Sequence, residues 1–205
     1  MDGGHVGRAA RLAAPLAALA LAASAPLPAP PLLAAPASMQ AGDRVFRSGT
    51  GGESALIRQL SGGRYSHVGI VVQTAPRVLI AHAGTDEEPR HPNQVLLATW
   101  EAFASRRWAQ TLAVARPRFL DAAQRAASAR AAAARVGQAF ELRPVDNPAA
   151  PLPLYCTTLL LEAVRAQAPA FAPAWQRLEL PLMRGDYLFP HALAQQDVHW
   201  LLQGE

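Results

Sequence analysis

The 205-residue chain is 51% apolar and 6% aromatic, and its formal net charge is +4. Its length fits one domain of ordinary size once a removable leader is subtracted. The positive charge comes from arginines spread along the whole chain, with no basic stripe interleaved with aromatic residues. Nucleic-acid binding therefore has little support, while weak attraction to anionic envelope polymers stays open.

The first forty residues are typical of an export signal followed by a tether. Arg8 and Arg11 precede an apolar run at 12–23 that is too short to span a bilayer, and small residues follow it. We predict a signal peptide at 1–25, hence a periplasmic or secreted protein without a stable membrane span after cleavage. An uncleaved amphipathic or membrane anchor is the alternative. No cysteine stands directly after the apolar run, so a lipoprotein is not expected. The Pro/Ala-rich residues 26–40 are predicted to be a linker.

The remainder, residues 41–205, is predicted to form a single domain. In chain order, we expect a strand at 42–47, a helix at 53–60, strands at 67–73 and 78–83 around a turn, a strand at 95–97, a helix at 99–106, a strand at 111–115, helices at 119–140 and 156–164, and a last strand at 185–189. Segments 86–93 and 141–153 are predicted to be loops, because they contain two and four prolines.

The chain has one cysteine, Cys156. An unpaired cysteine in an exported protein is either a buried small hydrophobe or a thiol kept for its chemistry. Cys156 follows the Pro-rich loop and starts a predicted helix, where the helix dipole and free amide N–H groups favour a thiolate and can hold an oxyanion. Thr157 and Thr158 place small hydroxyls in the same turn, which leaves room for a substrate carbonyl.

A nucleophilic cysteine needs a base, and His67 is the strongest candidate. It opens an apolar strand directly after the segment GGRYS at 62–66, so it is expected at the sheet rim, where substrate can reach it. A capped strand-end histidine is the alternative interpretation. His82, on the neighbouring strand, could accept the Nδ1–H of His67 and fix its tautomer, or it could fill a half-buried sheet position.

A zinc site built from Cys156, His67 and His82 is a rival hypothesis. The chain has no paired C-x-x-C or H-x-x-x-H spacing, the usual signature of such ligands. We therefore expect neither a metal nor another cofactor.

Three segments carry a family resemblance: GDRVFRSG at 42–49, SGGRYSHVGI at 61–70 and YCTTL at 155–159. In this order they resemble the YiiX-like circularly permuted papain-like cysteine hydrolases, a branch of the NlpC-type cell-wall amidase superfamily. The resemblance spans 41–189 and implies an α+β, papain-like/NlpC-type fold. Its antiparallel sheet or partly open barrel would pack against helices that include the cysteine helix.

The resemblance also implies roles for residues. It assigns Cys156 as nucleophile and His67 as base, and it places a third polar residue on the strand after the histidine strand. His82 stands there, where relatives often have Glu. Relatives also commonly read Cys-Ser-Glu-Leu after the nucleophile, and Thr158 replaces that Glu. The expected substrate and oxyanion vicinity comprises Tyr65, Ser66, Tyr155, Thr157 and Thr158.

The function implied is hydrolysis of an amide or ester through a thioester acyl-enzyme. Export favours a cell-envelope peptide, such as a peptidoglycan stem peptide, as substrate. Two alternatives stay open: a lipid-directed acyl hydrolase or acyltransferase, and a catalytically idle module that binds envelope peptide or lipid.

Overall fold

The computed structural model describes residues 1, 31, 33–85, 93–145, 150–181 and 183–204. The predicted signal peptide beyond residue 1, residues 26–30 of the predicted linker and most of the predicted loop at 86–93 lie outside this range. Within it, no helix combines the length and the apolar character needed to cross a membrane.

The fold is α+β and is built on a six-stranded antiparallel sheet with strand order β4-β3-β2-β1-β5-β8. The strands are β1 (Arg44–Gly49), β2 (His67–Gln73), β3 (Leu79–Gly84), β4 (Gln94–Thr99), β5 (Ala109–Pro117), β6 (Gln176–Leu180), β7 (Met183–Tyr187) and β8 (Val198–Gln203), and the helices are α1 (Gly52–Ser61), α2 (Trp100–Phe103), α3 (Ala122–Ala133), α4 (Cys156–Arg165) and α5 (Pro190–Ala194). The sheet is open, with β4 and β8 at its edges. The α+β class and the antiparallel sheet are thereby confirmed.

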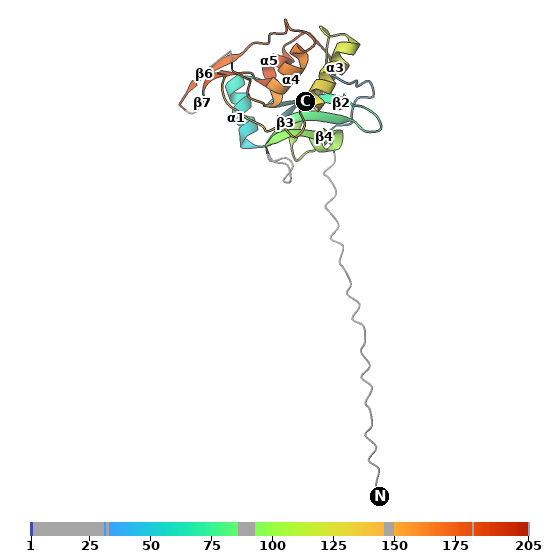
Figure 1. The fold of residues 1–205 in the computed structure, drawn as a ribbon. Helices are drawn as coiled ribbons and strands as arrows, with labels where there is room; N and C mark the ends of the chain where they lie inside the picture. Colours follow the sequence, from blue (N-terminus) through green and yellow to red (C-terminus); the bar gives the residue numbers. More distant parts are fainter. Residues whose placement is uncertain (2–30, 32, 86–92, 146–149, 182, 205) are drawn as a thin grey trace.

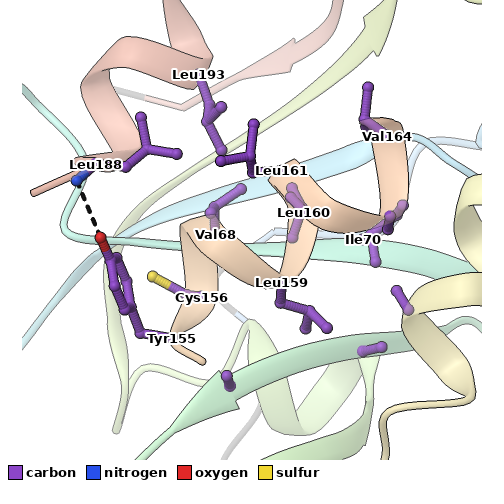
Figure 2. Close-up of a cluster of buried hydrophobic side chains, with 14 of the residues drawn as sticks. Val68, Ile70, Tyr155, Cys156, Leu159, Leu160, Leu161, Val164, Leu188 and Leu193 are labelled. Carbon is purple, nitrogen blue, oxygen red and sulfur yellow. Dashed lines mark hydrogen bonds between the residues drawn. The ribbon is translucent and has the colours of Figure 1, made fainter. Parts of the chain in front are cut away.

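Two apolar clusters sandwich the sheet. On one face, α3 and α4 pack against β2, so that Ile70 meets the leucines of α4 (Figures 1 and 2). On the other face, Val71 and Ile80 pack against Trp100 and Phe103 of α2. This two-sided burial explains the continuous apolar run of β2, because a strand with both faces covered needs no polar side.

The Pro/Ala-rich residues just before the domain pack against this second face. Trp100 donates its indole N–H to the backbone oxygen of Leu33 at 2.9 Å. Met39 is buried, and Leu33 packs beside it. We expected residues 26–40 to form a tether without a packed core. Proline does exclude regular helix, but it does not prevent extended backbone from covering a sheet with its apolar side chains. The described part of that segment, from residue 33 on, therefore belongs to the packing of the domain.

The third helix is shorter than the predicted 119–140. It begins after Asp121, whose side chain accepts from the backbone N–H of Gln124 at 2.8 Å in a capping box. Beyond Ala133 the chain turns, with Gly137 in the left-handed region at φ 86°, and the Gly137 N–H donates to the Val95 oxygen on β4. The Ala-rich sequence favours a longer helix, but the residues near Gly137 bond to β4 and therefore leave the helix.

Three elements near the C-terminus escaped prediction: β6, α5 and β8. Strand β6 pairs with β7 as a separate hairpin that lies at the side of the domain next to α1 (Figure 1). Gln176 of β6 donates to the Leu60 oxygen of α1 at 2.7 Å. Strand β6 (QRLEL) has only two apolar residues and is mostly exposed, whereas the apolar residues of β8 (VHWLLQ) were an available signal.

A buried ion pair ties the start of β1 to β5. Both carboxylate oxygens of Asp43, which is 0% exposed, accept from Arg116 at 2.8 Å, and one of them also accepts from the Gln40 N–H at 2.7 Å. Because the carboxylate has no access to water, its charge depends on these hydrogen bonds, whereas the Arg116 side chain is 20% exposed.

We predict that Asp43→Asn lowers the free energy of unfolding by about 2 kcal/mol in urea denaturation, because the amide replaces only part of the charged hydrogen bonding of the carboxylate. The matched control is Asp197→Asn, because Asp197 is 67% exposed and lies 4.0 Å from Arg118. That change should cost less than about 1 kcal/mol. Equal losses in the two variants would contradict the structural role given to Asp43.

Candidate active site

Cys156 is the first residue of α4 and lies where that helix meets the start of β2. Its side chain is 9% exposed and packs in the apolar cluster with Val68 and Leu159. Figure 2 shows the sulfur at the end of the helix, beside the ring of Tyr155 and close to Val68. The predicted junction of loop and helix at Cys156 is therefore present, and the thiol lies at the N-terminal end of α4.

Hydrogen bonds from three side chains hold this first turn in place. The Thr158 hydroxyl donates to the Pro153 oxygen at 2.6 Å and accepts from the Tyr155 N–H at 2.8 Å, which closes the helix start. The Thr157 hydroxyl donates to the Leu188 oxygen at 2.6 Å, and the Leu188 N–H donates to the Tyr155 hydroxyl at 3.0 Å. Both threonines are fully buried, so they position the cysteine from behind and do not offer hydroxyls to a substrate.

His67 and His82 form a direct pair. Nε2 of His67 lies 3.0 Å from Nδ1 of His82, and the two rings meet edge to face. We expected His82 to engage Nδ1 of His67, and the structure corrects that atom to Nε2. Strand register explains the pairing, because both side chains project from the same face of β2 and β3. The correction leaves Nδ1 of His67 as the ring atom available to a thiol.

One pocket brings Cys156 and His67 together. Of the five residues expected near the oxyanion, Ser66 and Tyr155 line this pocket. Tyr65 instead stacks with Phe46 and Trp200 in the core. Both residues line the pocket, and no hydrogen bond between the thiol and the His67 ring occurs in the described structure. Catalytic pairs are often loose before substrate binds.

Burial dominates the titration of both groups. It raises the pKa of the Cys156 thiol to about 11, although backbone hydrogen bonds from Val68 and Thr157 and the charge of Arg47 act against it. Burial also holds the pKa of His67 well below its usual value, with further lowering by Arg47 and His82. We expected the helix start to favour a thiolate, but burial outweighs it. The resting pair at neutral pH is a thiol beside a neutral imidazole.

Sequence patterns did not single out two neighbours of the histidine pair, Arg47 and Phe103. Arg47 lines the pocket, and its guanidinium carbon lies 4.4 Å from the centre of the Phe103 ring. The same ring lies 5.7 Å from His67 and 5.1 Å from His82 between ring centres. Arg47 shares one face of β1 with Val45, and this polar residue at a buried position gave no clear signal in the sequence. Phe103 gave none, because only the tertiary fold places it under the histidines.

No protein-family model matches the chain, and no curated protein matches it either. Among solved structures, the chain is similar to one described as metalloprotein yiiX from Escherichia coli O157:H7, DUF1105. The TM-score is 0.62 at 15% sequence identity, and the match covers 80% of this chain and 97% of that chain. At this identity the likeness concerns the fold. The protein therefore has a YiiX-like α+β fold.

We predict slow alkylation of Cys156 at neutral pH and a rise in rate with pH toward about 11, because only the thiolate reacts. Iodoacetamide labelling followed by mass spectrometry measures this rate. The urea-unfolded chain serves as the control and should titrate at about 8.5, the value of an exposed cysteine. A folded protein that labels as fast at neutral pH as the unfolded chain would contradict the buried-thiol state.

Proposed function

We propose that this protein is a cysteine hydrolase that cleaves an amide or an ester through a thioester intermediate. The observation that carries the proposal is the shared pocket: the only cysteine, at a helix start, lies with His67 in one pocket wall, and His82 stands behind the His67 ring at 3.0 Å. A nucleophile, a base and a residue that orients the base are the parts that such catalysis requires.

The proton path follows from the ring contacts. If Nε2–H of His67 donates to Nδ1 of His82, Nδ1 of His67 carries the lone pair that accepts the Cys156 proton. The thiolate then attacks the carbonyl carbon to form the carbon–sulfur bond, and the imidazolium returns its proton to the leaving amine or alcohol. Water, deprotonated by His67, hydrolyses the thioester. Free amide N–H groups at the start of α4 would hold the oxyanion.

Chain order supports a relation to the permuted papain-like and NlpC-type hydrolases. The histidine strand β2 precedes the cysteine helix α4, as the resemblance implies, and the YiiX-like fold is compatible with it. Export through the predicted leader remains part of the proposal. It would bring the enzyme to envelope amides and esters.

The yiiX protein is described as a metalloprotein. No group of three or more His, Cys, Asp or Glu side chains able to hold a metal ion occurs in the described residues. Cys156, His67 and His82 together therefore do not fit the zinc hypothesis, and no catalytic step is derived through a metal.

The pocket favours an apolar acyl group as part of the substrate. Its wall beyond the cysteine consists largely of apolar side chains from α1, the segment before the cysteine loop, and the β7–α5 region, namely Ile57, Phe140, Leu142, Met183, Leu188, Phe189 and Pro190. A peptidoglycan stem peptide carries several carboxylates, whereas the described lining has a single cation, Arg47, and an acid, Glu53. Such a wall suits an acyl chain better than a polyanionic peptide.

We predict that Cys156→Ala abolishes release of product and that His67→Ala lowers kcat/KM by about 100-fold or more. Acyl esters, acyl amides and muropeptides are offered separately to the purified full chain, and products are identified by mass. His199→Ala is the control, because His199 is an exposed histidine on β8. Failure to cleave any of these substrates would favour the alternative of an idle binding module.

We further predict that acyl-chain length matters at this site. Leu142→Asp places a charge on the apolar wall, so it should lower kcat/KM for long-chain acyl esters while leaving acetyl esters almost unaffected. Leu97→Asp is the matched control, because Leu142 and Leu97 are 49% and 46% exposed and Leu97 lies outside this pocket. Equal losses on short and long chains would contradict an acyl-binding wall.

A further inference from the structure

A buried arginine lies beside the histidine of the candidate site. Arg47, on β1, is directly opposite His67 in the β1–β2 register, and it is 4% exposed. Directly opposite residues in an antiparallel pair have Cβ atoms about 5 Å apart on the same face. The guanidinium and the imidazole are therefore close neighbours inside the protein.

The position of the guanidinium is fixed by its surroundings. Nη1 of Arg47 donates to the Phe103 oxygen at 3.0 Å, and its guanidinium carbon lies 4.4 Å from the centre of the Phe103 ring. Both rings of the histidine pair pack on that same aromatic ring. Phe103 thus contacts the cation and both histidines, and of these residues Arg47 and His67 line the pocket.

We propose that Arg47 is a positioning residue whose buried charge keeps His67 unprotonated at rest, so that the base is ready to accept the cysteine proton even in mildly acidic surroundings. The inference rests on the proposed role of His67 as base. Its physical basis is that a second positive charge on the imidazole would lie against a fixed guanidinium in a poorly solvated place, where charges interact strongly.

The other ionisable groups around His67 do not oppose its protonation as Arg47 does. His82 pairs with it from β3, and four others line the same pocket: Cys156 at the start of α4, Tyr155 just before it, Tyr187 on β7 and Glu53 on α1. Glu53 is exposed and would favour the imidazolium weakly through water. Arg47 stands apart because it carries a full positive charge directly opposite His67, and its contacts with Phe103 hold it there.

The charge acts in two ways during turnover. It opposes the imidazolium and favours the thiolate, in agreement with the lowering of both the His67 and the Cys156 pKa by Arg47. Once His67 has taken the cysteine proton, the same repulsion makes the imidazolium a stronger acid toward the leaving group. Arg47 therefore favours release of the proton to the departing amine or alcohol.

The test compares the two titrations in Arg47→Gln and the wild type. The His67 ring is followed by NMR on ¹³C-labelled histidine, and the Cys156 thiol by iodoacetamide labelling across pH. Neither measurement needs a substrate, so the test is independent of whether the protein proves to be a hydrolase. Arg47→Lys keeps the charge, and Arg64→Gln removes an exposed arginine that bonds the Gly204 oxygen.

We expect Arg47→Gln to raise the pKa of both His67 and Cys156, with labelling at mildly alkaline pH slowing about tenfold. Arg47→Lys should restore both titrations, and Arg64→Gln should move neither. A guanidinium that only fills space predicts a different pattern: its loss admits water, so the pKa of His67 rises while that of Cys156 falls. That pattern, or no change in either group, would overturn the proposal.

The wild-type protein provides a test that does not depend on the variants folding. If Arg47→Gln fails to fold, Arg47→Met is used in its place, because methionine keeps the apolar stem of the side chain. Should both fail, the His67 titration in the wild-type full chain decides, because a His67 that titrates at or above the ordinary value for histidine would show that no cation holds it neutral.

Discussion

The arrangement of the site depends on the contact between the first turn of α4 and the start of β2. Thr158 closes the helix start on Tyr155, while Thr157 and Tyr155 attach the turn to Leu188. These bonds are buried, so each one is maintained without competition from water. Cys156 is thereby held in a wall shared with His67, and the pocket and its chemistry follow from that placement.

Burial at this contact has a chemical consequence. A buried thiol and a half-buried imidazole opposite a cation are most stable uncharged, and the pKa directions of Cys156 and His67 agree with that state. The proposed mechanism therefore begins from a neutral pair and creates charge only when a carbonyl is present to receive it. In that mechanism the hydrogen bond between His67 and His82 would orient the base, and Arg47 would bias its protonation.

Much of the site could be predicted from the chain because its signals are local. A single cysteine after a Pro-rich loop, a histidine that opens a β-branched strand and a second histidine one strand later are all readable by position. The roles of the two threonines were misjudged, because a hydroxyl next to a nucleophile looks the same in sequence whether it faces the substrate or the backbone. Only the packing of α4 against Leu188 separates the two cases.

The sequence by itself indicated the β2–β3 hairpin and the candidate pair Cys156 and His67, since periodicity and helix-start signals act within a few residues of each other, and the family resemblance of its motifs implied the α+β class. The tertiary structure alone decided the ends of α3, the docking of residues 33–40, the Nε2 contact between the histidines and the place of Arg47 over Phe103. These features join residues far apart in the chain. Their energies come from burial and strand register, which no local pattern encodes.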